Sequence, residues 1–189
     1  MSLKDQLQAD LKTAMLNKET VRRDVIRYTQ AGLKNAELAK NQKLIEERAH
    51  LWRTETVDED GDPITLINEP VRDRELAEIA KLTPLNDEEQ LAVLITEVKR
   101  RRDTIAEAEK ANRPEIVARE QAELDVVLGY LPKQMSRAEV KAAAQQVVNE
   151  VGAKGPQDTG KVMGKLMPQL KGKADGKMIS EVVKELLVN

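Results

Sequence analysis

The chain has 189 residues, enough for one large or two small domains with a buried core, and its charge is nearly balanced at −2. It has no cysteine and no apolar run near the roughly 20 residues of a membrane span, which excludes disulfides, thiol catalysis and a transmembrane segment, and its N-terminus does not resemble a signal peptide. Aromatic residues make up only 2% of the chain and helix-forming residues are abundant, so we expect an all-α, cytoplasmic protein.

Two helices are predicted at the start of the chain. Ser2 and Asp5 have the spacing of a capping box, and a second helix is expected to begin near Thr20 and to run past Leu38. Apolar residues recur every three or four positions, the period of a helix face that packs against a core. The inward faces are predicted to be Leu3, Leu7, Leu11, Ala14 and Met15, and then Val21, Val25, Tyr28, Gly32 and Leu33.

Residues 43–85 break this pattern and are predicted to be an insertion. Within them, WRTETVDEDGDPITLIN (residues 52–68) contains two β-prone stretches around a turn-rich acidic centre. The insertion is therefore expected to be either a short β-hairpin or an irregular, extended excursion.

The acidic centre has a partial likeness to a calcium loop. Asp58, Asp60, Asp62 and Glu69 have the spacing of positions 1, 3, 5 and 12 of an EF-hand loop. Pro63 stands where that loop requires glycine, so a solvated acidic turn is the better interpretation, and no metal site is expected.

Two further helices complete a predicted N-terminal domain of residues 1–134. Asn86 and Glu89 have the spacing of a capping box for the first of these helices. Pro114 is expected in the first turn of the second helix, which continues to Pro132. The inward faces are predicted to be Leu91, Leu94, Ile95 and Val98, and then Ile116, Glu120, Leu124, Val127, Leu128 and Leu131.

Residues 135–189 are predicted to form a small three-helix domain. SRAE (residues 136–139) is a capping box for a helix that ends at Gly152. Thr159 is expected to cap a short second helix that ends near Pro168, and Asp175 is expected to cap the last helix. The glycines of this domain are expected to serve tight turns, and one of them, Gly164, to let two helices approach closely. These turn glycines are Gly160, Gly164, Gly172 and Gly176.

The segment GKVMGKLMPQLKGKADGK (residues 160–177) does not match a phosphate-binding P-loop. That motif needs four residues between its first glycine and the Gly-Lys pair, followed by a hydroxyl residue. Here Gly160 and Gly164 enclose only three residues, and Leu166 follows Lys165. The second candidate, Gly172 to Lys177, fails in the same way, because Met178 follows its lysine. The glycines and lysines of the segment therefore need a different explanation.

Charge is unevenly distributed along the chain. The net charges are +4 for residues 1–43, −6 for 44–86, −3 for 87–134 and +3 for 135–189. Basic side chains gather on the face of Arg23, Arg27 and Lys34, in the run 99–102, and in the lysines of the C-terminal domain. We predict phosphate contacts for these basic side chains, although solvated helix faces with ordinary ion pairs are the alternative. The nucleic-acid-binding residues are expected to be the lysines of the C-terminal domain. They are Lys161, Lys165, Lys171, Lys173 and Lys177.

The composition also bears on the kind of ligand and on catalysis. With so few aromatic residues, stacking on single strands is not expected, so the backbone and shape of a folded RNA are the predicted target, and not DNA. His50 is the only histidine and is expected at the surface. No catalytic residue, metal site or cofactor is predicted, and the chain is not expected to be an enzyme by itself.

Three stretches of the chain carry a resemblance to a known family. They are LKDQLQADLKTAMLNKETVRRDVIRYTQAGLKNAELAK near the N-terminus, DEEQLAVLITEVKRRRDTIAEAEKANRPEIVAREQAELDVVLGYLPKQMS in the middle, and GKVMGKLMPQLKGKADGKMISEVVKELL near the end. Together they resemble the GatB/YqeY family, most closely its free-standing YqeY-like proteins. The resemblance covers residues 1–42 and 86–189, and the chain departs from it at about 43–85.

The resemblance implies a helical N-terminal part and a three-helix C-terminal part. Related domains form the tail of the B subunit of the tRNA-dependent amidotransferase, a carbon–nitrogen ligase that uses glutamine as amide donor, where the tail helps to hold tRNA. The resemblance therefore implies a tRNA-binding accessory module whose partners are amidotransferase or aminoacyl-tRNA synthetase subunits. The alternative is an adaptor that docks a protein through its helix faces and binds no RNA.

Overall fold

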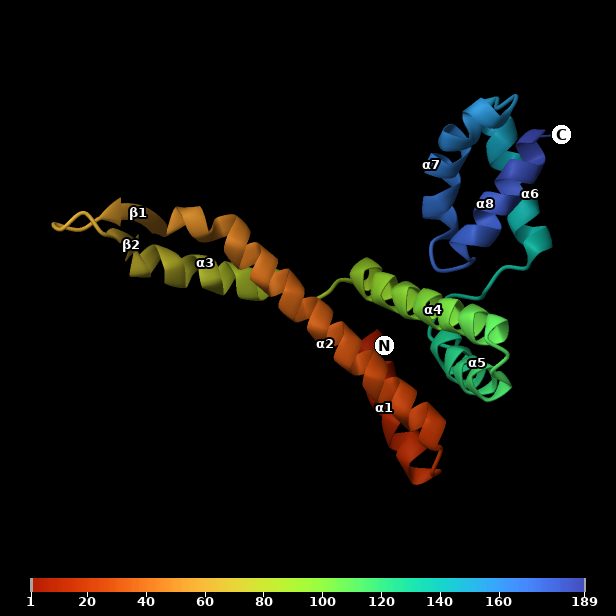
Figure 1. Cartoon of the computed structure of the whole chain (residues 1–189), viewed down its shortest axis with the longest axis horizontal. Coiled ribbons are helices and arrows are strands. Elements are labelled where there is room, and N and C mark those ends of the chain that lie inside the picture. Colours follow the sequence, from red (N-terminus) through yellow and green to blue (C-terminus); the bar gives the residue numbers. More distant parts are fainter. Residues whose placement is uncertain (1, 189) are drawn as a thin grey trace.

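The computed structural model describes residues 2–188, which are mainly helical, as predicted (Figure 1). None of the helices in this described part is both long and apolar enough to cross a membrane. The elements, in chain order, are α1 (Leu3–Leu16), α2 (Thr20–Arg48), η1 (Ala49–Leu51), β1 (Arg53–Val57), β2 (Pro63–Ile67), α3 (Glu69–Leu82), α4 (Asp87–Lys110), α5 (Pro114–Leu128), α6 (Arg137–Val151), η2 (Pro156–Asp158), α7 (Thr159–Leu170) and α8 (Gly176–Val188), where η marks a short 3₁₀ helix.

The N-terminal body consists of α1, the first half of α2, α4 and α5. The predicted capping boxes of Ser2 with Asp5 and of Asn86 with Glu89 are both present, and they set the starts of α1 and α4. Two adjoining clusters of buried side chains hold these helices together. One cluster consists of Leu7, Ala14, Ile26, Leu33 and Leu85, and the other of Val25, Leu94, Val98, Leu124 and Val127.

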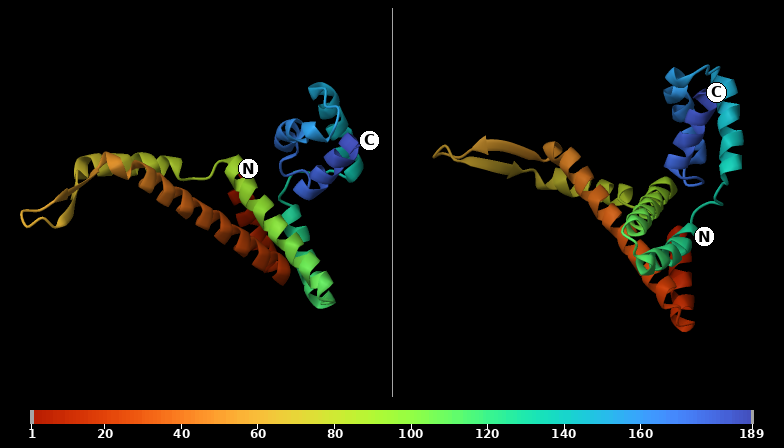
Figure 2. Two further views of the ribbon diagram at one scale, coloured as in Figure 1. Left: turned by 45° about the horizontal axis from the view of Figure 1, so that its top comes forward. Right: turned by 45° about the vertical axis from the view of Figure 1, so that its right-hand side comes forward.

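Residues 41–83 form an arm that projects from this body. The second half of α2 and the antiparallel helix α3 make the shaft, and the hairpin of β1 and β2 forms its end (Figures 1 and 2). Of the two alternatives predicted for residues 52–68, the structure has the hairpin; Arg53 pairs with Ile67 at its base and Val57 with Pro63 at its tip. The shaft is joined by an ion pair of 3.0 Å between Arg48 and Glu75.

The helical part of the arm differs from the sequence-based expectation. Residues 43–48 continue α2, and α3 is a helix where an irregular or extended chain was expected. The side chain of Asn68 accepts a hydrogen bond from the backbone N–H of Val71, and Pro70 lies in the first turn, so α3 has an ordinary helix start. Ile79 is buried in the shaft, which explains why this helix is stable beside α2.

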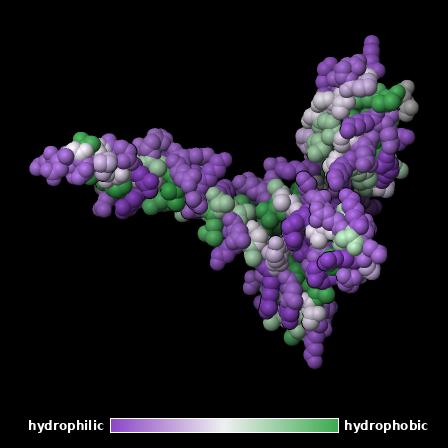
Figure 3. Space-filling model, viewed as in Figure 1, coloured by the Kyte–Doolittle hydropathy of each residue, from purple (hydrophilic) through white to green (hydrophobic). Residues whose placement is uncertain are grey.

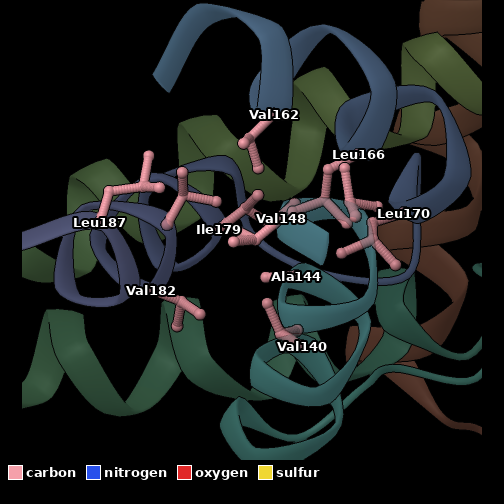
Figure 4. Packing of buried hydrophobic residues seen from close by; sticks show 11 residues of the cluster. Val140, Ala144, Val148, Val162, Leu166, Leu170, Ile179, Val182 and Leu187 are labelled. Carbon is pink, nitrogen blue, oxygen red and sulfur yellow. The ribbon is translucent and has the colours of Figure 1, made fainter. Parts of the chain in front are cut away.

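The C-terminal domain consists of α6, α7 and α8 around one apolar core (Figure 4). The predicted capping box of Ser136 and Glu139 starts α6, and Gly152, with φ of 63°, ends it. The side chain of Asp175 accepts the backbone N–H of Lys177 at 2.8 Å and so caps α8 as predicted. The core side chains are Val140, Ala144, Val147, Val148, Val162, Leu166, Leu170, Ile179, Val182, Val183 and Leu187.

Helix α7 differs from the prediction at both ends. Asp158, not Thr159, is the residue before the helix, and the hydroxyl of Thr159 donates to the backbone carbonyl of Pro156 at 2.6 Å. At the other end, α7 continues through Pro168 to Leu170. Gly164 is exposed, so water can reach the carbonyl that Pro168 leaves without a donor, which makes proline tolerable in this last turn.

The glycines of the C-terminal domain have different surroundings. Gly160 and Gly164 lie inside α7, and a Cβ at either position would meet no neighbouring atom within 4 Å, so Gly164 does not bring two helices together. Gly176 begins α8. Gly172 alone of the four has a positive φ, of 75°, and a Cβ there would lie 3.0 Å from Cδ1 of Leu91 in α4.

These surroundings predict opposite effects for two alanine substitutions. Gly164→Ala should raise the free energy of unfolding by about 0.5–1 kcal/mol, because alanine favours an open helical position. Gly172→Ala should lower it by about 1–2 kcal/mol, because the positive φ strains any residue with a Cβ. Urea unfolding followed by circular dichroism measures both, and a loss of stability in Gly164→Ala would contradict the open surroundings of that residue.

Candidate functional site

A cleft of about 580 Å³ lies where the C-terminal domain meets α4 of the N-terminal body. The residues of the α7–α8 loop and the start of α8 form one wall, and α4 forms the other. Its floor is apolar and its rim is charged. The apolar residues include Ile95, Val98, Leu131, Met167, Leu170 and Ile179, and the charged residues are Lys99, Arg102, Asp103, Lys171, Asp175 and Lys177.

The four basic side chains of residues 99–102 point to different sides of helix α4. Successive helix residues point about 100° apart, so the four side chains cannot share one surface. Lys99 and Arg102 line the cleft. Arg100 forms an ion pair with Glu97 and lies over the ring of Tyr28, with 5.2 Å from its Cζ to the ring centroid.

The remaining arginine of the run, Arg101, is buried between α4 and α5. Its Nη1 contacts the carboxylates of Glu120, at 3.2 Å, and of Glu123. Its Nε lies 2.8 Å from Glu97 without the geometry of a hydrogen bond, so that contact is ionic only. Arg101 therefore joins two helices of the body and is not available to a ligand.

Two ion pairs join the domains across the cleft. Arg102 contacts Asp175 at 2.6 Å, and Lys177 lies 3.8 Å from Asp103. Burial by itself raises the pKa of Asp175, but the guanidinium of Arg102 and the backbone N–H of Lys177 outweigh it and hold that pKa below its usual value. Asp175 thus stays ionised and connects the cap of α8 to α4.

The linker between the domains is attached at both ends. On one side, the hydroxyl of Tyr130 donates to Asp10 of α1 at 2.8 Å, and burial together with this hydrogen bond raises the pKa of Tyr130 to about 12. On the other side, the side-chain amide of Gln134 donates to the carbonyl of Gly172 at 2.7 Å, and the N–H of Met135 donates to the carbonyl of Lys173 at 2.7 Å. These hydrogen bonds keep the α7–α8 loop beside the body.

The five lysines predicted to contact phosphate fall into two groups. Lys161 forms an ion pair with Asp158 and Lys165 with Glu150, both outside the cleft. Lys171 and Lys177 line the cleft, and Lys173 is an exposed neighbour in the same loop. Lys161 and Lys165 lie on α7, ten and six residues before Lys171, which corresponds to about 15 Å and about 9 Å along the helix at 1.5 Å per residue.

The sequence counts Lys99 and Arg102 among the basic side chains that could contact phosphates, but it does not join them to the lysines of the C-terminal domain in one site. No local pattern in the sequence shows that Lys99 and Arg102 lie opposite the loop of the C-terminal domain. Lys99 and Lys171 have no ion pair within residues 2–188, whereas Arg102 and Lys177 are each paired. With four cationic and two anionic side chains, the cleft has a net charge of +2.

The other sequence candidates do not form a chemical site. His50 is exposed, and its Nδ1 lies 2.9 Å from the carbonyl oxygen of Glu47. Asp58 accepts hydrogen bonds from the N–H groups of Asp60 and Asp62 inside the hairpin turn, while Glu69 begins α3 beyond the far end of β2. The described residues contain no group of three or more potential ligands that could hold a metal ion.

Comparison with protein families identifies the chain. A family model described as Yqey-like protein matches residues 58–187, more than half of the sequence. The chain belongs to the YqeY-like protein family. A search of curated proteins found no match.

The matched range includes most of the helices of this YqeY-like protein that are described above. It contains α4, α5, the C-terminal domain as far as residue 187, and all residues that line the cleft. It also contains residues 58–85, so the family pattern includes the second strand of the hairpin and α3, although the resemblance was expected to be interrupted at about 43–85.

Proposed function

We propose that this YqeY-like protein is an RNA-binding accessory module that takes a folded RNA of the tRNA type. The observation that carries the proposal is the gathering of Lys99, Lys171, Lys173 and Lys177 from two domains around one cleft. Cationic side chains held on a rigid surface release counterions when they contact phosphates, which supplies most of the affinity of such sites.

The aromatic residues favour a folded RNA over a single strand. Trp52 is buried in the arm, Tyr28 lies beneath Arg100, and the hydroxyl of Tyr130 is bonded to Asp10. No aromatic ring within residues 2–188 lies among the residues that line the cleft, and unpaired bases are bound mainly by such rings. Recognition through backbone and shape suits these side chains better.

The resemblance to the amidotransferase tail extends the proposal to a partner. In that tail, a similar domain helps to hold tRNA while other parts of the enzyme carry out the ligase chemistry. We therefore propose that this protein associates with an amidotransferase or an aminoacyl-tRNA synthetase, as a non-catalytic component that contributes tRNA contacts.

Replacement of three lysines tests RNA binding. The variant Lys171→Gln, Lys173→Gln, Lys177→Gln should weaken binding to folded tRNA and make the slope of log K against log salt shallower by about two to three, because each lost phosphate contact removes about 0.7–0.9. Fluorescence anisotropy with labelled tRNA, measured over a salt series, gives both quantities.

The same domain offers a matched control. Lys141, Lys154 and Lys184 are exposed, have no ion pair within residues 2–188, and lie outside the cleft. Their replacement with glutamine removes equal charge and should leave most of the affinity. An equal loss of tRNA affinity in both triple variants would indicate only a general charge effect. If the wild type does not bind tRNA, the adaptor function is favoured instead.

A further inference from the structure

The tip of the arm is an acidic projection with an apolar edge. The side chains of Glu59, Asp60 and Asp62 are exposed and form no ion pair within residues 2–188. Beside them, Val57 is 60% exposed although it is a large apolar residue, and it pairs with the exposed Pro63. A two-stranded hairpin is marginally stable by itself, so an exposed apolar tip of this kind gains stability from a covering surface.

The interdomain cleft has the complementary properties. Its floor is apolar, and its rim carries four cations against the carboxylates of Asp103 and Asp175, a net charge of +2; the cations are Lys99, Arg102, Lys171 and Lys177. Lys99 and Lys171 have no carboxylate partner within residues 2–188, and Lys177 lies 3.8 Å from Asp103, a long contact for an ion pair. The cleft can therefore take a projection that brings apolar side chains to the floor and carboxylates to the rim.

The cleft cannot receive the tip of its own arm. In all three ribbon views the arm and the C-terminal domain project from the body in different directions, and the tip of the arm lies far from the C-terminal domain (Figures 1 and 2). The space-filling view shows the same separation, with hydrophobic side chains scattered along the arm (Figure 3). Contact between these two surfaces needs a second copy of the chain.

We propose that the acidic hairpin tip of one copy binds in the basic cleft of another copy. Charge distinguishes this contact from pairing between two arms. Residues 44–86 have a net charge of −6 and residues 135–189 a net charge of +3, so two arms repel each other whereas an arm and a C-terminal domain attract. Each copy carries both surfaces, and a twofold pair therefore contains the contact twice.

Charge reversal tests the contact in the absence of RNA. The tip variant Glu59→Lys, Asp60→Lys, Asp62→Lys and the cleft variant Lys99→Glu, Lys171→Glu, Lys177→Glu should each be monomeric under conditions in which the wild type associates. An equal mixture of the two should associate again, because each tip then meets a cleft of opposite charge. Sedimentation velocity over a series of protein and salt concentrations measures the mass, and association of the wild type should weaken as salt increases.

Two further measurements make the result decisive. The variant Lys141→Glu, Lys154→Glu, Lys184→Glu, reversed outside the cleft, should associate like the wild type, and circular dichroism reports whether each variant is folded. A wild type that stays monomeric at low salt and high concentration overturns the proposal, as does a mixture of the reversed variants that remains monomeric. Because RNA is absent, the outcome does not depend on whether the protein binds tRNA.

Discussion

Replacement of Arg101 with methionine is expected to lower the free energy of unfolding of the N-terminal body by about 3–5 kcal/mol. The side chain of Arg101 is 3% exposed and contacts three carboxylates, those of Glu97, Glu120 and Glu123. Removing the cation leaves these carboxylates near one another in a site with little water, and the penalty of an unpaired buried charge exceeds the net value of the original ion pairs.

Arg100 provides the matched control for this prediction. It belongs to the same helix and contacts the same Glu97, but its side chain is 48% exposed. Arg100→Met should therefore lower the free energy of unfolding by about 1 kcal/mol or less, because it removes only a solvent-screened ion pair and the contact with Tyr28. Urea unfolding of both variants gives the difference, and equal losses would show that burial of Arg101 is not what makes it important.

Replacement of Leu166 with alanine is expected to lower the free energy of unfolding of the C-terminal domain by about 2–5 kcal/mol and to leave that of the N-terminal body unchanged. Leu166 is fully buried between α6, α7 and α8, so the substitution removes apolar contacts and leaves a cavity (Figure 4). The N-terminal body has a separate set of buried side chains and should keep its stability.

Hydrogen exchange read by mass spectrometry resolves the two domains. In Leu166→Ala, protection should fall in residues 136–188 and remain in α1, α4 and α5. Gln169→Ala, an exposed change in the same helix, should alter protection little. If protection falls equally throughout the chain, the two domains unfold as one unit and the predicted boundary near residue 135 is not a boundary of stability.

The sequence was most informative where local chemistry decides the structure. The capping boxes at Ser2, Asn86 and Ser136, the αL glycine at 152 and the hairpin of residues 52–68 are all present, because each depends on side chains a few residues apart. Helix α3 was missed because its apolar signal is weak, and Ile79 is its only buried residue.

Interactions between distant segments were harder to predict. A signal for Arg101 did exist, because it follows Leu94 and Val98 at the spacing of an inward helix stripe. Its partners Glu120 and Glu123 lie on another helix, and no local pattern pairs them. Gly172 was correctly placed in a turn, but its proximity to Leu91 depends on how the two domains meet.

The attachment of the linker limits how the two domains can reorient. Tyr130 is fixed to α1, and Gln134 and Met135 are fixed to the α7–α8 loop, so only residues 131–133 lie between the anchors. One of these, Pro132, has a ring that restricts its φ to about −65°. A hinge this short permits little swing, so the two domains lose little orientational entropy when a ligand contacts both walls of the cleft.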